Sequence, residues 1–190
     1  MPSTYLKSNL SAETWAEAAL DAIARDGVSA VSVEPLAKAL GVTKGSFYWH
    51  FPNRDALLAA ALELWERRET QEVLERVRRE EDPRRRIEIL FREVSGDRRT
   101  SPLYLALSAA SSDPKIGAAV RRVAERRLGF MTECFAALGL ADDEARRRAL
   151  MAYAMYLGML QLQRDGRFAL PSAGEFQRFV DEVVAVLAPG

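Results

Sequence analysis

Residues 35–54 combine side chains suited to binding a polyanion. Between Pro35 and Arg54 the lysine and arginine residues are Lys38, Lys44 and Arg54, and no acidic residue occurs. Over the whole chain, Lys plus Arg and Asp plus Glu both number 27, so this local excess of positive charge is set in a neutral sequence. An acid-free basic stretch is what the phosphate backbone of a nucleic acid requires. The stretch predicts contact with DNA.

The same region has the layout of a helix-turn-helix unit. Ser32 is a predicted N-cap for one short helix, and Thr43 is a predicted N-cap for a second, from Lys44 to His50. Gly41 supplies the turn between them. In such units the second helix lies in the major groove of DNA, with its N-terminal residues on base edges.

The second of these helices carries side chains that fit this role. Gly45 and Ser46 follow Lys44 and keep the start of the helix slim, so that its backbone can approach the groove. Three hydrogen-bond donors with aromatic surface follow, suited to phosphates and sugars: Tyr48, Trp49 and His50. We therefore expect this helix to read DNA.

A catalytic role for the same residues finds less support. Ser46 and His50 stand at i and i+4, as a nucleophile and its base would. No acid orients the imidazole, because Asp55 falls in the next helix, so we assign no catalytic residue. With one histidine and one cysteine in the chain, we expect no metal and no cofactor. Cys134 falls on an apolar stripe, which favours a buried side chain over a redox sensor.

Helix-periodic segments separated by capping residues, proline and glycine account for the chain. The first runs from Ser11 to Gly27, and a long one starts at Asn53 and ends near Arg79. About nine helices and no credible pair of strands predict an all-α fold. Four arginine clusters lie among acidic residues and are expected on solvated helix faces: residues 84–86, 121–122, 126–127 and 146–148.

Two domains are expected. Residues 1–56 would form a helix-turn-helix DNA-binding domain and residues 57–190 a helical ligand-binding and dimerisation domain, joined only through the long helix of residues 53–79. The N-terminus has no apolar signal-peptide core, and the longest uncharged apolar run, residues 149–160, is too short to span a bilayer. We expect a cytoplasmic protein with no membrane partner.

Residues 41–58 read GVTKGSFYWHFPNRDALL, which resembles the DNA-binding signature of TetR-type transcriptional regulators. The resemblance covers about residues 11–62. It implies base contacts near Lys44 and Gly45. It also implies that the hydroxyls of the predicted N-caps Ser32 and Thr43 contact phosphate. Arg54 stands where the family usually has lysine, and a phosphate contact survives that exchange. The positions implied to contact DNA are Ser32, Thr43, Lys44, Gly45, Ser46, Tyr48, Trp49, His50 and Arg54.

The resemblance also implies that two aromatic residues of this region lie in the core. Phe47 and Phe51 are expected to pack on Leu36, Leu40 and Leu57.

Residues 149–160 are apolar all round a helix, so this helix must be buried on both sides. One side would face the chain's own core and the other a second copy, as in the four-helix bundle of TetR-family homodimers. The alternative is that the run is simply central core. The predicted dimer interface consists of Ala152, Leu157, Leu160, Phe176, Phe179, Val180 and Val183.

Aromatic and methionine side chains on several helices predict a pocket for a largely apolar small molecule. The same residues would also fill an ordinary core. The candidates are Trp65, Phe91, Tyr104, Phe130, Met131, Tyr153, Tyr156 and Met159. We expect Tyr104 and Tyr156 to supply the polar contacts.

Together these features predict a DNA-binding transcriptional regulator that is not an enzyme. The expected partners are a palindromic or pseudo-palindromic operator, a small-molecule effector and a second copy of the chain. A repressor that releases its operator on binding an apolar effector is favoured. The alternatives are an activator of the same fold, and a helical binding protein or enzyme that never meets DNA.

Overall fold

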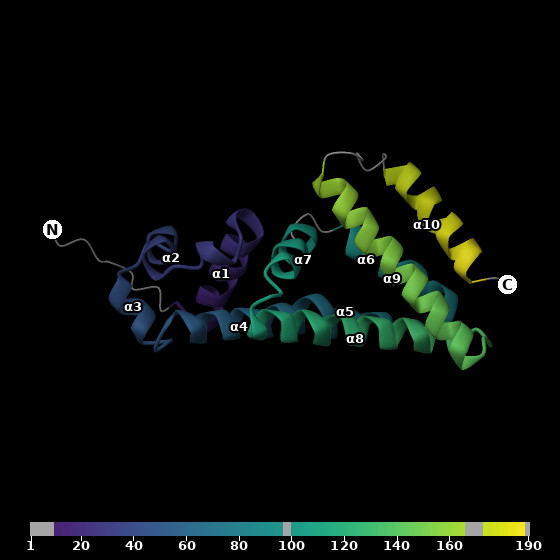
Figure 1. The fold of residues 1–190 in the computed structure, drawn as a ribbon, viewed down its shortest axis with the longest axis horizontal. Helices are drawn as coiled ribbons and strands as arrows, with labels where there is room; N and C mark the ends of the chain where they lie inside the picture. The colour runs from purple at the N-terminus through teal and green to yellow at the C-terminus, as the bar shows by residue number, and fades with distance from the viewer. Residues whose placement is uncertain (1–9, 97–99, 166–172, 189–190) are drawn as a thin grey trace.

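The computed structural model describes residues 10–96, 100–165 and 173–188, and every regular element in these ranges is helical (Figure 1). The elements are α1 (Ala12–Asp26), the 3-10 turn η1 (Val28–Ala30), α2 (Val33–Ala39), α3 (Lys44–Tyr48), α4 (Arg54–Glu66), the π-helical turn η2 (Arg67–Gln71), α5 (Glu72–Val77), α6 (Pro83–Gly96), α7 (Thr100–Ala109), α8 (Pro114–Ala137), α9 (Asp142–Arg164) and α10 (Ala173–Leu187). With α4, η2 and α5 counted as one, the described chain has nine helices. The all-α prediction is confirmed.

Capping side chains start several of these helices where the sequence predicts them. The Ser11 hydroxyl accepts from the Thr14 amide, and Asn53 Oδ1 accepts from the Ala56 amide. Asp113 accepts from the first amides of α8. Ser32 and Thr43 occupy the N-cap positions of α2 and α3, yet neither side chain makes a capping hydrogen bond. Both hydroxyls are exposed.

The helix that starts at Arg54 is interrupted by a π-helical turn that the sequence did not predict. The helical hydrogen bonding changes at Arg67–Gln71 and returns to the α pattern at Glu72. Inside this turn the Thr70 side chain is buried, whereas Arg67 and Arg68 reach outward to Glu13 on α1. π-helical turns of this kind are rare and frequent at functional sites.

The helix-turn-helix end and the rest of the molecule are packed together over a broad contact. α4–α5 and α8 run side by side along the length of the molecule, and α7 packs on both α1 and α8 (Figure 1). Lys115 on α8 pairs with Asp55 in the first turn of α4, at 2.8 Å. The prediction that residues 53–79 are the only link between the two domains is therefore wrong.

A small aromatic core fixes α3 against α1. Trp15 and Phe47 are fully buried, with ring centroids 5.4 Å apart in an edge-to-face arrangement. Phe51 lies 5.8 Å from Phe47, and Leu36 and Leu57 are buried with them. The predicted core of the helix-turn-helix unit is confirmed.

One glycine at the start of α8 allows a close approach between α8 and the preceding turn. A Cβ added to Gly117 would meet the backbone carbonyl of Ser111 well inside van der Waals contact, whereas one added to Gly129 on the same helix would meet nothing. We predict that Gly117→Ala lowers the free energy of unfolding by about 1–3 kcal/mol. Gly129→Ala should raise it by about 0.5–1 kcal/mol, because alanine favours the helix. Urea unfolding followed by circular dichroism measures both. Equal stabilisation by the two substitutions would show that the close approach to Ser111 does not exist.

Candidate DNA interface and effector pocket

The recognition helix α3 turns one aromatic residue inward and leaves its neighbours outside. Phe47 is fully buried, whereas Tyr48 is 55% and Trp49 89% exposed. A tryptophan with this exposure has no packing role inside the chain, so its surface is free for a partner. Gly45 is exposed, and Ser46 and His50 are half-buried.

Lys44, at the start of α3, is engaged by an acidic residue just outside the acid-free stretch. Its Nζ lies 2.7 Å from Oε1 of Glu34 on α2. This hydrogen bond and the charges lower the pKa of Glu34 and raise that of Lys44. Both side chains are solvent-exposed, so the pair contributes little to folding stability. A phosphate or base that binds Lys44 would compete with Glu34 for its ammonium group.

Arg54 has a structural task in addition to its predicted one. Its Nε donates to the Val31 carbonyl at 2.7 Å, and its Nη2 donates to the Val28 carbonyl at 3.0 Å. These bonds join the first turn of α4 to η1, directly before α2. In this structure Arg54 positions the helix-turn-helix unit, and its phosphate contact stays a prediction.

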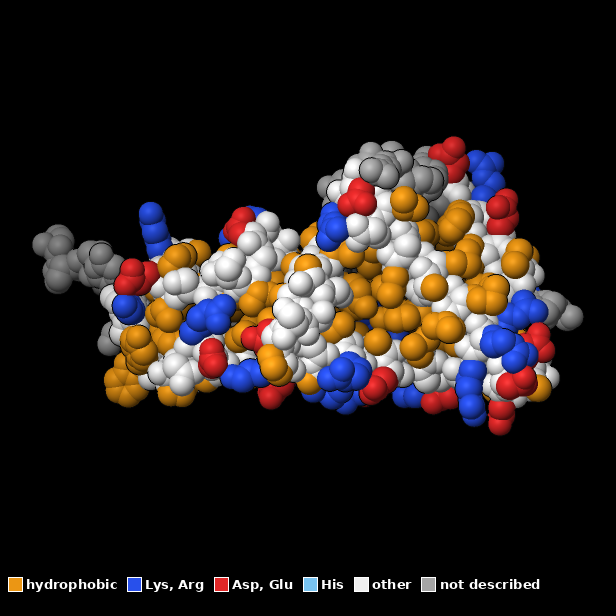
Figure 2. Space-filling model, viewed as in Figure 1, with side chains coloured by type: hydrophobic (Ala, Val, Ile, Leu, Met, Phe, Trp, Pro, Cys, Tyr) orange, Lys and Arg blue, Asp and Glu red, His pale blue; other side chains and the backbone are white. Residues whose placement is uncertain are grey.

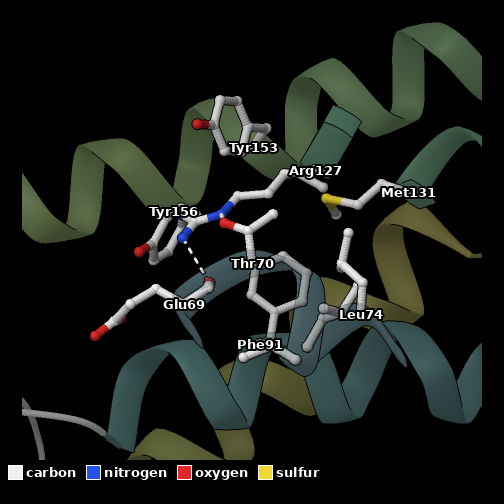
Figure 3. Close-up of a pocket in the computed structure, with 11 residues that line it drawn as sticks. Glu69, Thr70, Leu74, Phe91, Arg127, Met131, Tyr153 and Tyr156 are labelled. Carbon is white, nitrogen blue, oxygen red and sulfur yellow. Dashed lines mark hydrogen bonds between the residues drawn. The ribbon is translucent and has the colours of Figure 1, made fainter. Parts of the chain in front are cut away.

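A pocket that is partly open to solvent lies between η2–α5, α6, α8 and α9 (Figure 3). Four of the eight predicted lining residues lie on its wall: Phe91, Met131, Tyr153 and Tyr156. The other four were wrongly placed there. Trp65, Tyr104, Phe130 and Met159 are buried but do not line it, because they pack into the core around it.

The wall contains polar groups that the sequence reasoning missed, above all Arg127. This residue is 7% exposed, although its cluster was expected on a solvated helix face. Its Nη2 donates to the Glu69 carbonyl at 2.9 Å and its Nε to Thr70 Oγ1 at 3.2 Å, both within the π-helical turn. A signal was available, because Arg127 stands four residues after Val123 and four before Met131, on the apolar stripe of α8.

Two buried groups in this pocket have no hydrogen-bond partner among the described residues. They are Nη1 of Arg127 and the hydroxyl of Tyr156. Burial raises the pKa of Tyr156 to about 12, against the opposing effect of the Arg127 charge, so the phenol is neutral at physiological pH. Tyr104 was expected to offer its hydroxyl to a ligand, but that group hydrogen-bonds Tyr153 at 3.1 Å.

Elsewhere on α8, Cys134 is fully buried, and burial raises the pKa of its thiol to about 11. A thiol that stays protonated at neutral pH is a poor nucleophile. This environment agrees with the prediction of a buried apolar role.

The predicted dimer residues fall on two sides of α9 and α10. Four were wrongly assigned to the surface, because they are buried within the single chain: Ala152, Leu160, Val180 and Val183. Leu157 and Phe179 are half-buried, and the side chain of Phe176 lies outside the described residues. The apolar side chains that α9 and α10 do expose are Leu150, Met151, Met155, Leu162 and Val186. Figure 2 shows apolar side chains gathered along α9.

In the described ranges, no helix is both long enough and apolar enough to cross a membrane.

The fold and the exposed second helix of residues 32–50 define an all-helical protein with an N-terminal helix-turn-helix unit. The model of the bacterial regulatory proteins of the tetR family matches residues 16–68. The HTH-type transcriptional regulator AcrR of Shigella flexneri is 42% identical over 50 residues, which span 26% of this chain and 22% of AcrR. The chain thus matches about a fifth of the length of that relative.

Solved structures extend the similarity of fold over nearly the whole chain. A transcriptional regulator from Rhodococcus sp. Rha1 is 23% identical, with a TM-score of 0.74, 94% of this chain covered and 96% of that one. A TetR transcriptional regulator from Legionella pneumophila is 17% identical, with a TM-score of 0.74 and coverages of 88% and 94%. FadR from Bacillus subtilis, solved in complex with stearoyl-CoA, is 16% identical, with a TM-score of 0.68 and coverages of 93% and 97%. Residues 16–68 are thus similar to the bacterial regulatory proteins of the tetR family, and the described chain shares its all-helical fold with these solved structures.

The Glu34–Lys44 pair generates a prediction about DNA affinity. Glu34→Gln removes a negative charge beside the recognition helix and releases Lys44, so affinity for DNA should rise about two- to fivefold at low salt. Fluorescence anisotropy with a labelled duplex measures the change, which should shrink as salt is added. Glu75→Gln makes the same charge change at an exposed position of α5. It is the control and should leave the affinity for DNA unchanged. Weaker binding by Glu34→Gln would instead show that Glu34 itself accepts a hydrogen bond from DNA.

Proposed function

We propose that this protein is a repressor that binds operator DNA through α3 and releases it when a small molecule enters the pocket lined by η2. The observation that carries this proposal is that one continuous helix serves both sites. It begins at Arg54, which holds the helix-turn-helix unit, and its π-helical turn forms part of the pocket wall. An effector in the pocket therefore touches the same element that orients the DNA reader.

The DNA-reading part of the proposal rests on exposure and charge. Lys44 and Gly45 start α3 at the surface, and Tyr48 and Trp49 extend from its end. Base contacts from the start of the helix and phosphate contacts from its end are the usual geometry of a helix-turn-helix unit. Ser32 and Thr43 add two hydroxyls that no capping bond uses.

A continuous set of contacts would transmit a ligand-induced movement from the pocket to the helix-turn-helix unit. Glu66, at the end of α4, is 5% exposed and is bound by Arg122 at 2.9 Å and Arg126 at 2.5 Å, both on α8. The next residue of α8 after Arg126, Arg127, bonds the π-helical turn. A ligand that changes the position of Arg127 acts on α8 and on the long helix at once. These contacts link the two sites that the proposed allosteric response requires.

The effector part is supported by the pocket's lining, which is apolar apart from a few polar groups, as is typical of small-molecule sites. A protein of the same fold, FadR of Bacillus subtilis, was solved in complex with stearoyl-CoA. That complex supports an effector with an apolar portion for the present chain.

A homodimer is the assembly we propose. Met151 and Met155 stand one turn apart on the exposed face of α9, and Leu162 continues that face. Ala154 and Gly158 on the same exposed side would let a second helix approach closely. Two copies joined here would present two α3 helices to the two halves of a palindromic operator.

The DNA-reading proposal is tested by two substitutions in α3. Lys44→Ala should weaken binding to the region upstream of the protein's own gene about tenfold or more and alter base preference. Tyr48→Phe should weaken binding less, and equally across sequences, because a phosphate contact carries no base information. Salt-titrated gel shifts measure both. Arg121→Ala, an exposed charge on α8, is the control and should bind like the wild type. Wild-type binding by both α3 variants would refute the assignment of this helix.

The dimer is tested at the exposed face of α9. Met155→Glu would bury a charge between the two copies, so we predict a folded monomer. Analytical ultracentrifugation should give the wild type twice the 21.2 kDa mass of one chain, and the variant a single chain mass. Arg121→Glu on exposed α8 is the control and should stay dimeric. A wild type that sediments as one chain at micromolar concentration contradicts the proposal.

A further inference from the structure

The polar groups of the pocket carry information about the chemistry of its ligand. Arg127 is a guanidinium that is more than nine-tenths buried, and its hydrogen-bond partners are neutral oxygens. No carboxylate of the described residues forms an ion pair with it. Glu69 contributes its backbone carbonyl to Arg127, while its carboxylate points away (Figure 3). The ring of Tyr104, 5.7 Å from the guanidinium, offers only a partial compensation of the charge.

A buried cation without an anionic partner is costly, because its hydration is lost and no opposite charge replaces it. Proteins keep such groups where something else supplies the charge. The guanidinium borders a pocket with an opening, but its Nη1 is inaccessible to solvent, so an anion would bind it only after neighbouring side chains move aside.

The free donors define the shape of that anion. Nη1 of Arg127 has no hydrogen-bond partner, and neither does the hydroxyl of Tyr156, which is 6% exposed. Figure 3 shows the guanidinium directed toward Tyr156. One charged N–H and one neutral O–H match the two oxygens of a singly charged carboxylate. A phosphate monoester has a higher charge and one more oxygen, for which this pocket shows no second cation.

The rest of the wall requires an apolar body. Leu74, Leu90, Phe91 and Met131 line the remaining pocket and offer no hydrogen bond to a polar ligand. Resting on the proposed effector function of this pocket, we infer that the ligand is an apolar carboxylic acid, with its carboxylate on Arg127 and Tyr156 and its hydrocarbon part against these side chains.

The same contact explains how such a ligand would be sensed. Arg127 already bonds the carbonyl of Glu69 and the hydroxyl of Thr70 in the π-helical turn. A carboxylate that draws the guanidinium toward Tyr156 competes with these two oxygens. The bonds that hold α8 to the turn are therefore the ones that ligand binding changes.

The test compares acids with neutral amides of the same skeleton. Isothermal titration calorimetry on the full chain uses two pairs of probes, decanoate with decanamide and 4-phenylbutyrate with 4-phenylbutanamide. In at least one pair the acid should bind tenfold or more tightly than the amide. Arg127→Gln should reduce this preference to less than twofold, and Tyr156→Phe should reduce it in part. Arg121→Gln, which removes an exposed arginine from the same helix, should keep it. If Arg127→Gln fails to fold, Tyr156→Phe and the wild-type comparison carry the test.

Equal binding of acid and amide, an acid preference that survives in a folded Arg127→Gln, or no binding of either acid would overturn the inference. Operator release, followed by fluorescence anisotropy in the same titrations, separates this result from the proposed function. Release of the operator by acid and amide alike would support the proposed regulatory function and contradict the carboxylate site. An Arg127-dependent acid preference without operator release supports the carboxylate site and removes the proposed response.

Discussion

The arrangement of the molecule depends on the ion pairs that the buried Glu66 carboxylate forms with Arg122 and Arg126. Glu66 ends α4, it is almost inaccessible to solvent, and two arginines of α8 bind it. Removing both arginines would leave the Glu66 carboxylate buried without compensation, which is far more costly than losing a surface ion pair. Together with Lys115 on Asp55, this contact fixes α8 along the whole of α4. The position of the helix-turn-helix unit is therefore set by α8 as well as by the chain that connects this unit to the rest of the molecule.

The elements of the fold could be predicted because their signals are local. Ser11 and Asn53 cap the helices that were expected to start there, since an N-cap requires only a side chain and an amide two or three residues away. The core around Phe47 was likewise predictable from a short motif. The π-helical turn was not, because it depends on Thr70 and Glu69 meeting Arg127, 57 and 58 residues away along the chain.

The sites were predicted less well, and the reason differs for each. Residues 149–160 of α9 are apolar all round the helix, so the sequence does not indicate which side faces the core. Ala152 and Leu160 proved to face inward, and Met151 and Met155 outward. In the pocket, the expectation that an arginine belongs at the surface outweighed the position of Arg127 on an apolar stripe. At the candidate DNA interface, the acid-free stretch begins at Pro35, directly after Glu34. The fold nevertheless brings the Glu34 carboxylate to Lys44.

These contacts also limit the movement that a ligand can cause. A π-helical turn that reverted to α-helix would shift the helix on one side by one residue, about 100° around the axis. If α4 made this rotation, the Glu66 carboxylate would move away from Arg122 and Arg126 and remain buried without a partner. The ion pairs therefore oppose a change of register in α4 and permit movements in which α4 and α8 tilt together. Because Arg54 bonds η1 from the first turn of α4, the helix-turn-helix unit follows that tilt. A ligand that favours one tilt over the other shifts the equilibrium by its difference in affinity for the two states, and by no more than that.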